Sequence, residues 1–118
     1  MKGLIIRREW LNKIFRQGKS WEMRATDTKH RGETALIEAG TGLIVGQCHI
    51  TATHKLGQDE ARASLQHHQV DDLSLLNKWC WAWHLENIQQ YANPISYQHP
   101  QGAVIWVNLS ESLNLGEA

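Results

Sequence analysis

The residues of this chain whose types and spacing could do chemistry are concentrated in one short segment, Gly18–Arg24. If residues 21–24 are extended, the period of two directs Glu22 and Arg24 to one face of the strand. Lys19 can reach the same space from across a glycine turn. The segment therefore predicts two cations and a carboxylate around one small volume, a group that can bind an anion or exchange protons with a substrate. A plain salt-bridge network is the alternative.

The charge distribution favours a local anion-binding face. The chain has 12 Lys and Arg and 12 Asp and Glu, so its net charge is zero, which argues against a nonspecific polyanion binder. Residues 1–32 nevertheless hold nine Lys and Arg against three Asp and Glu, a net charge of +6, and the remainder therefore carries −6. Such asymmetry indicates an anion-binding face on a neutral body. Scattered solvated charges are the alternative.

Other residue types with chemical potential are less organised. Two of the six tryptophans, Trp21 and Trp83, are candidates to stack on a base, and most of the others are expected in the core. The seven histidines include no i, i+4 pair with a third ligand, so we expect no metal site and no cofactor. Cys48 and Cys80 form no C-x-x-C motif and are expected to be reduced.

The elements that must position this segment can be predicted from periodicity. An apolar run over Gly3–Ile6 predicts a buried strand, and the apolar residues of Glu9–Gln17 recur on one helical face, with Gly18 at the C-terminal cap. Glycine tolerates positive φ, so the turn at 40–42 predicts a hairpin. It joins two predicted strands, Thr34–Glu38 and Leu43–Thr53.

The second half of the chain mixes short helices with strands. Asp59–Gln66 and Asp72–Trp79 are predicted as helices, because carboxylates near their starts oppose the helix dipole. Alternating tryptophans predict a strand that begins near Cys80, and Gly102–Leu109 predicts a last β-rich run. Two prolines bound residues 94–100 and confine them to a loop or an edge strand.

Together these elements predict an α+β fold, a small mixed β-barrel of about five to six strands with two or three short helices beside a cleft. We expect one domain over residues 1–109 and a polar tail over residues 110–118. No apolar run approaches the roughly 18 residues of a membrane span, and there is no signal-peptide h-region. We therefore expect a cytoplasmic protein without membrane contact. The sequence leaves the oligomeric state open.

At the Gly18–Arg24 segment the chain resembles the ASCH domain family of the PUA-like superfamily, in its small bacterial single-domain form. The family pattern is a glycine-lysine pair, a Glu or Thr three residues after the lysine, and then an arginine. Agreement continues through Thr28, His30, Arg31 and Gly32, the glycine turn at 40–42, and the late segment Trp83–Asn87. The resemblance implies a compact PUA-like barrel and a role in recognising RNA or a modified base.

Our leading functional hypothesis is an RNA or nucleoside binding domain with a basic cleft. Lys19, Arg24 and Arg31 would hold phosphate or carbonyl oxygens, and Glu22 would accept a hydrogen bond from an exocyclic amine. The complete set of predicted ligand-binding residues is Lys19, Trp21, Glu22, Arg24, His30, Arg31 and Trp83.

Two further classes of function remain as alternatives. In a hydrolase, Lys19 and Glu22 would be catalytic, either in a weak ribonuclease or in an amidohydrolase that acts on N4-acylated cytidine. Some ASCH proteins of the second kind use a lysine, a threonine nucleophile and a glutamate. Here Glu22 replaces the threonine, Ser20 lies two positions out of register, and the third member would be Asp71, Asp72 or Glu86. The last alternative is a regulatory protein-interaction module.

Overall fold

The computed structural model describes residues 1–112 and contains one curled sheet with short helices at its ends. The strands are β1 (Lys2–Ile6), β2 (Trp21–Arg24), β3 (Gly32–Glu38), β4 (Leu43–Lys55), β5 (Trp81–Ser96) and β6 (Trp106–Asn108). The helices are α1 (Arg8–Arg16), α2 (Gln58–Ala63), α3 (Leu65–His68), the 3₁₀ helix η1 (Leu73–Asn77) and α4 (Leu109–Ser112). None of the helices within residues 1–112 has the length and apolar character needed to cross a bilayer.

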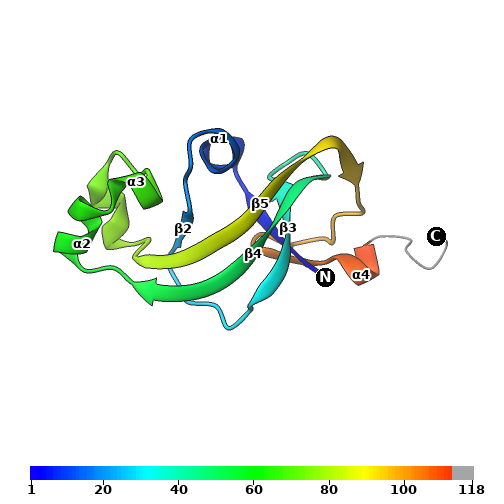
Figure 1. Cartoon of the computed structure of the whole chain (residues 1–118). Helices are drawn as coiled ribbons and strands as arrows, with labels where there is room; N and C mark the ends of the chain where they lie inside the picture. Colours follow the sequence, from blue (N-terminus) through cyan, green and yellow to red (C-terminus); the bar gives the residue numbers. More distant parts are fainter. Residues whose placement is uncertain (113–118) are drawn as a thin grey trace.

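The sheet is mixed and barrel-like but open on one side. Its strand order is β2-β5-β4-β3-β1-β6, in which only β1 and β3 run parallel. The long strands β4 and β5 curve across the whole molecule, with α1 above them and the helices α2 and α3 at one end (Figure 1). The predicted α+β fold is confirmed. Because β2 and β6 are opposite edges of the sheet and do not pair, the half-barrel has an open seam beside them.

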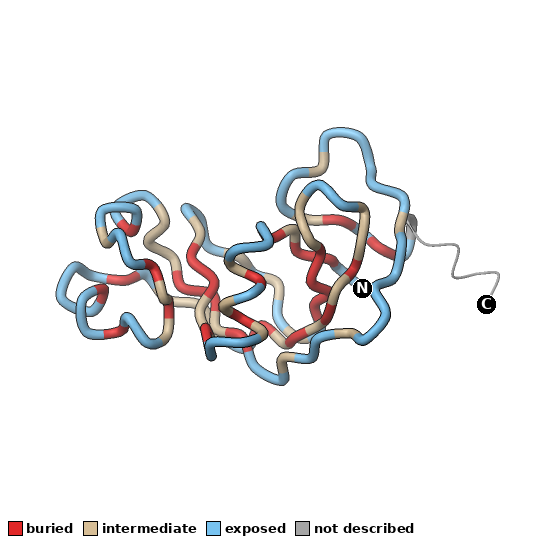
Figure 2. Tube along the Cα trace, turned by 90° about the horizontal axis from the view of Figure 1, so that it is seen from above, coloured by how far each residue is buried: buried red, intermediate tan, exposed pale blue. Residues whose placement is uncertain are grey.

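Three apolar clusters hold the elements together. The central one packs α1, through Leu11 and Ile14, onto the inner face of the sheet around Trp83. A second cluster lies at the helical end and includes Met23 and Val70. A third joins β1, β3 and the residues near α4. The buried stretches in Figure 2 follow the strands and the inner sides of the helices, as the predicted alternation of Leu43–Thr53 requires.

Several local predictions differ from the structure. The predicted helix Asp59–Gln66 is two helices, because the backbone at Ser64 leaves the helical region and its hydroxyl donates to the Glu60 carbonyl. Residues 72–79 form only the short 3₁₀ helix η1, capped by Asp72. In the run Gly102–Leu109 only residues 106–108 form a strand, β6, and Leu109 begins α4. Residues 110–112 of the predicted tail lie in α4, and its remainder, residues 113–118, lies outside the described residues.

The far half of β5 forms an edge of the sheet. Strand β2 pairs with only the first four residues of β5, so within the described chain the segment from residue 85 onward has β4 as its only strand neighbour. Pro94 lies where the register between β4 and β5 shifts, between the pairs Ile44↔Ile95 and Gly46↔Gln90. This agrees with the expectation that the prolines mark a loop or an edge.

Gly46 on β4 is required by close contact rather than by backbone conformation. A Cβ atom there would lie 2.4 Å from the Gln89 carbonyl oxygen on β5 and 2.7 Å from the Phe15 ring on α1. The first neighbour is backbone and cannot move without distorting the β4–β5 pairing. Gly46 therefore lets α1 approach the sheet.

We predict that Gly46→Ala lowers the free energy of unfolding by about 1–3 kcal/mol, the usual cost of overpacking. Urea denaturation followed by circular dichroism measures this change. The matched control is Gly57→Ala, because an added Cβ at Gly57 meets nothing within 4 Å. That control should cost at most about 1 kcal/mol, from a poorer helix cap. Equal losses in the two variants would show that the contact at Gly46 has no special weight.

Candidate functional site

A cavity of about 390 Å³ lies at the open seam of the half-barrel. It is bounded by β2 on one side, by Ile5 of β1 and the residues before β6 on the other, and by the helical end at its floor. Its charged and polar lining residues are Arg7, Lys19, Glu22, Arg24 and Thr26, and its aromatic walls are Trp10, Trp79 and Trp83. The cavity is thus a mixed aromatic and charged site of the kind that binds small planar ligands.

Strand β2 aims the predicted side chains into this cavity. Gly18 has a φ of +75°, which ends α1 in a left-handed turn and starts the chain toward β2. Residues 21–24 are extended, as predicted, and pair with β5 through Glu22↔Trp83 and Arg24↔Trp81. Lys19, Glu22 and Arg24 all line the cavity. The sequence pattern therefore identified three side chains that the fold brings together.

Lys19 is a buried cation. Only 1% of the residue is exposed, and its ammonium donates a hydrogen bond to the backbone carbonyl of His68 and lies 5.0 Å from the centre of the Trp10 ring. Burial lowers the pKa of Lys19 to about 8, although the negative charge of Glu22 acts in the opposite direction. Lys19 therefore remains mostly protonated at neutral pH but can lose its proton at mildly basic pH.

Glu22, which is buried, and Arg24, which is half-buried, form an ion pair on β2 beside the open seam. The guanidinium donates from Nε to the carboxylate oxygen Oε2 at 2.9 Å, and its Nη2 lies 2.8 Å from the same oxygen as an ion-pair contact. Nη2 also donates to the Ile5 carbonyl on β1 at 2.8 Å, and the guanidinium lies 5.6 Å from the centre of the Trp83 ring. Arg24 thus joins β2 to β1 by a side chain where the sheet has no backbone pairing.

The second carboxylate oxygen of Glu22 is available to a ligand. Within residues 1–112 no hydrogen bond reaches Oε1, and no ion pair joins Glu22 to Lys19. The same part of the chain has no fully buried side-chain nitrogen or oxygen without a partner, so Oε1 is open to the cavity. The carboxylate of Glu22, an acceptor, and the ammonium of Lys19, a donor, therefore line the same cavity without forming an ion pair with each other.

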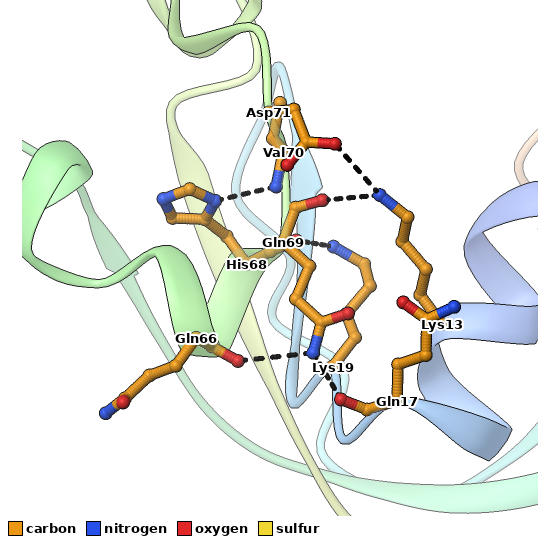
Figure 3. A network of polar contacts seen from close by, with 8 residues as sticks. All are labelled: Lys13, Gln17, Lys19, Gln66, His68, Gln69, Val70 and Asp71. Atoms are coloured by element: carbon orange, nitrogen blue, oxygen red, sulfur yellow. Dashed lines mark hydrogen bonds and ion pairs between the residues drawn. The ribbon is translucent and has the colours of Figure 1, made fainter.

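The floor of the site is fixed by contacts between α1 and the end of α3 (Figure 3). Gln69 has a φ of 53°, and this left-handed turn ends α3 with its last carbonyls free of the helix. The His68 carbonyl accepts from Lys19, and the Gln69 carbonyl accepts from Lys13 at 2.9 Å. Asp71 adds only a long, exposed ion pair with Lys13 at 3.9 Å. Two lysines thus hold the C-terminal end of α3, where cations are favoured.

The buried imidazole of His68 holds this turn in place. Its Nδ1 accepts from the Val70 amide at 2.9 Å, so Nε2 must carry the proton that is donated to the Ala61 carbonyl at 2.7 Å. Burial lowers the pKa of His68, which favours this neutral form. The His68 carbonyl, which accepts from Lys19, therefore belongs to a turn that the two hydrogen bonds of the His68 ring hold in place.

The two predicted stacking tryptophans lie on different sides of β2. Trp83 lines the cavity but is only 2% exposed, because its Nε1 donates to the Thr26 carbonyl and its ring stacks on Trp106 at 5.7 Å. Trp21 does not line the cavity and is stacked instead against His67 and His84. Trp83 is thus positioned as a wall of the site and Trp21 is not.

His30 and Arg31 lie outside the cavity, in the loop between β2 and β3. His30 contacts the Thr34 hydroxyl at 3.0 Å and the edge of the Trp106 ring. Arg31 donates to the carbonyls of Thr28 and His30 and to the Thr53 hydroxyl, although its side chain is exposed. These two residues can contact a ligand only if it extends beyond the cavity.

The candidates for a third catalytic member also lie elsewhere. Asp71, Asp72 and Glu86 are exposed, and none of them lines the cavity. Ser20 is absent from the lining as well, because its hydroxyl contacts Nδ1 of His67 at 3.1 Å. Among the residues that line the cavity within the described chain, Thr26 is the only one with a hydroxyl group.

Several residues that line the cavity are not among those predicted from the sequence. Arg7 and the apolar pair Val104 and Ile105, which are 75% and 41% exposed, form the rim. Ile105 reaches the rim because its carbonyl accepts from the Ile5 amide at 2.9 Å. Trp10 lies in α1, and its ring also faces Lys19. Spacing along the chain does not indicate the rim, because Val104 and Ile105 fall within the predicted β-rich run Gly102–Leu109 and their exposure follows only from the fold.

The described residues contain no group of three or more His, Cys, Asp or Glu side chains arranged to hold a metal ion. The cavity itself offers one carboxylate and three basic side chains. This lining suits an organic ligand with both donors and acceptors.

Comparisons with known proteins identify the family of the fold. A family model described as the ASCH domain matches residues 4–101. The crystal structure of ASCH from Zymomonas mobilis has a TM-score of 0.65 and 12% identity, and the alignment covers 80% of this chain and 72% of that one. A structure of a single-residue mutant of that protein has a TM-score of 0.66 and 12% identity, with 90% and 85% covered. No curated protein has a sequence that matches this chain significantly.

The buried ammonium of Lys19 predicts a specific dependence of stability on pH. Its pKa is about 8 in the folded protein and 10.5 ordinarily, so between these values the unfolded chain binds more protons and stability rises with pH. The full gain in the free energy of unfolding over this range is about 3 kcal/mol. Urea unfolding of the wild type and of Lys19→Met from pH 7 to 10.5 measures it.

The difference between the two proteins is the informative quantity, because it cancels the contribution of other groups, such as Cys48, whose pKa is raised by burial from the ordinary 9.0 to about 12. We expect the wild type to gain stability relative to Lys19→Met above pH 8. A constant difference would show that Lys19 is not buried as a cation.

Proposed function

Since the chain belongs to the ASCH domain family, whose fold is PUA-like, we propose that its cavity binds a single base of RNA or a free, ordinary or modified, nucleoside. The proposal rests on one observation. An open carboxylate oxygen of Glu22 and the ammonium of Lys19 both line a cavity with aromatic walls. A base with an exocyclic amine offers matching groups, because the amine donates and the neighbouring ring nitrogen or carbonyl accepts.

Glu22 and Lys19 have different roles in this proposal. Glu22 accepts from the exocyclic amine and so selects amine-bearing bases over uracil. Lys19 donates to the ring nitrogen or carbonyl beside that amine. Arg24 is a positioning residue, since its bonds to Glu22 and to the Ile5 carbonyl hold the carboxylate in one orientation. The indole walls of Trp10 and Trp83 enclose the planar base.

The rest of an RNA strand would follow the basic first third of the chain. Arg7 lies at the rim, and within the described residues its side chain has no hydrogen bond or ion pair, so it is free to meet a phosphate. Arg31 and His30 lie beyond the cavity and would contact flanking nucleotides. The location that goes with this proposal is the cytoplasm, where RNA and its nucleosides occur.

The binding proposal is tested with four ribonucleosides, of which cytidine, adenosine and guanosine carry an amine and uridine does not. We expect the wild type to prefer one of the amine-bearing nucleosides over uridine by about tenfold or more, which corresponds to one good base contact. Glu22→Gln should remove most of this preference, because the amide no longer offers only acceptors. Isothermal titration calorimetry measures the affinities.

The matched control is Glu86→Gln, which removes the same charge from an exposed position outside the cavity. It should leave the preference unchanged. The proposal fails if uridine binds as well as the other three, or if the two substitutions have equal effects.

A second candidate function, hydrolysis of N4-acylated cytidine, is favoured by one observation. The pKa of Lys19 is lowered to about 8, so its unprotonated amine can act as a general base near neutral pH. The arrangement departs from the family's amidase pattern because Glu22 stands in place of the threonine nucleophile. Thr26 lines the same cavity, but it belongs to the chain after β2 and not to the motif.

Incubation with N4-acetylcytidine, followed by mass spectrometry of the products, separates turnover from binding. We expect little or no product from the wild type and more from Glu22→Thr, which restores the threonine of the pattern. Rapid hydrolysis by the wild type that is lost in Lys19→Met, with substrate binding retained, would make hydrolysis the function instead.

A further inference from the structure

A second cluster of functional groups lies on the face of β2 and β5 that is turned away from the cavity. It surrounds Trp21 and contains His54 of β4, His84 of β5 and Glu60 of α2. His84 pairs with Ala52 and His54 with Ala82, so the two histidines are diagonal neighbours on one face of the sheet. None of these residues lines the cavity.

The two imidazoles point their ring nitrogens at each other. Nδ1 of His54 lies 2.7 Å from Nε2 of His84, and Nε2 of His54 lies 2.9 Å from Oε2 of Glu60. A carboxylate accepts and does not donate, so Nε2 of His54 carries the proton, and in the neutral imidazole Nδ1 of His54 presents a lone pair. Without a ligand, His84 must therefore donate from Nε2 to His54.

This arrangement places His54 in the tautomer that metal-binding histidines adopt. A ligating histidine donates its other ring N–H to a carboxylate, which fixes the ring and increases its basicity. If the proton of His84 moves from Nε2 to Nδ1, two lone pairs face the same gap. To hold an ion at the usual 2.0–2.1 Å from each nitrogen, the two nitrogens must separate from 2.7 Å to about 3 Å, and both rings must turn so that their lone pairs converge on the ion.

We propose that His54 Nδ1 and His84 Nε2 form a binding site for a divalent transition-metal ion, with Glu60 as the residue that orients His54. Two imidazoles suit Cu²⁺, Ni²⁺ and Zn²⁺, and Cu²⁺ binds most tightly among them. The described residues provide no third side-chain ligand, so water completes the coordination and the ion is exchangeable. His54 and Glu60 are about one third and two fifths exposed, which leaves the ion a path from solvent.

The site escapes an analysis of sequence spacing because its ligands are 30 residues apart and meet through strand register. Protons compete for imidazole lone pairs, so binding should weaken as the solution is acidified.

The proposal is tested by titrating Cu²⁺, and separately Zn²⁺, into the full chain and following calorimetric heat and tryptophan fluorescence. We expect one ion per chain, with quenching by Cu²⁺ because the Trp21 ring centre is 5.1 Å from that of His84. His54→Ala and His84→Ala should each abolish this site. Glu60→Gln should weaken it about 10- to 100-fold, as loss of an orienting carboxylate does.

The matched control is His49→Ala, which removes another β4 imidazole whose partner is Asn87. It should leave the affinity unchanged, and circular dichroism should show that every variant is folded. A second readout needs no substitution: ¹⁵N–¹H correlation spectra of the imidazoles should show His84 protonated on Nε2 without metal and on Nδ1 with Zn²⁺. Unchanged His54 and His84 resonances on adding Zn²⁺, or equal loss of affinity in His49→Ala, would overturn the proposal.

Discussion

The burial of the Lys19 ammonium is the constraint on which the site depends. A cation taken out of water needs compensating partners, and here a carbonyl, an indole face and the more distant charge of Glu22 provide them. The carbonyl belongs to His68, whose own ring is locked by two hydrogen bonds. The helical end of the molecule therefore packs beside β2 and also contributes a hydrogen-bond acceptor to the site. It supplies the carbonyl that makes a buried lysine tolerable, and Lys19 in turn joins α3 to the turn between α1 and β2.

The open seam forms the cavity that Lys19 lines. A closed barrel would pair β2 with its neighbour through backbone hydrogen bonds and leave no cavity there. In this chain Arg24 makes the connection with its side chain, through Glu22 and the Ile5 carbonyl. The same guanidinium thus supports the fold and orients the carboxylate.

The sequence predicted the central residues of the cavity lining but not those at its boundary. Lys19, Glu22 and Arg24 were predictable because they belong to one short segment, in which a glycine turn and the period of two decide their directions. Arg7, Val104 and Ile105 were not, since they meet the cavity only after β1 and β6 are paired. Residue type alone made Trp21 a candidate to stack on a base. The period of two over residues 21–24 places it on the face of β2 opposite to Glu22 and Arg24. Register between distant strands, as in the pair of His54 and His84, is information that spacing along the chain does not contain.

The unpaired side of β5 bears on how the protein behaves at high concentration. Backbone groups along an exposed strand edge can recruit a strand from another copy, the first step toward aggregation. Pro94 lacks an N–H and lies in a stretch of irregular register, so this edge is neither continuous nor flat. The irregular edge of β5, the longest described strand, thereby disfavours edge-to-edge assembly of two copies.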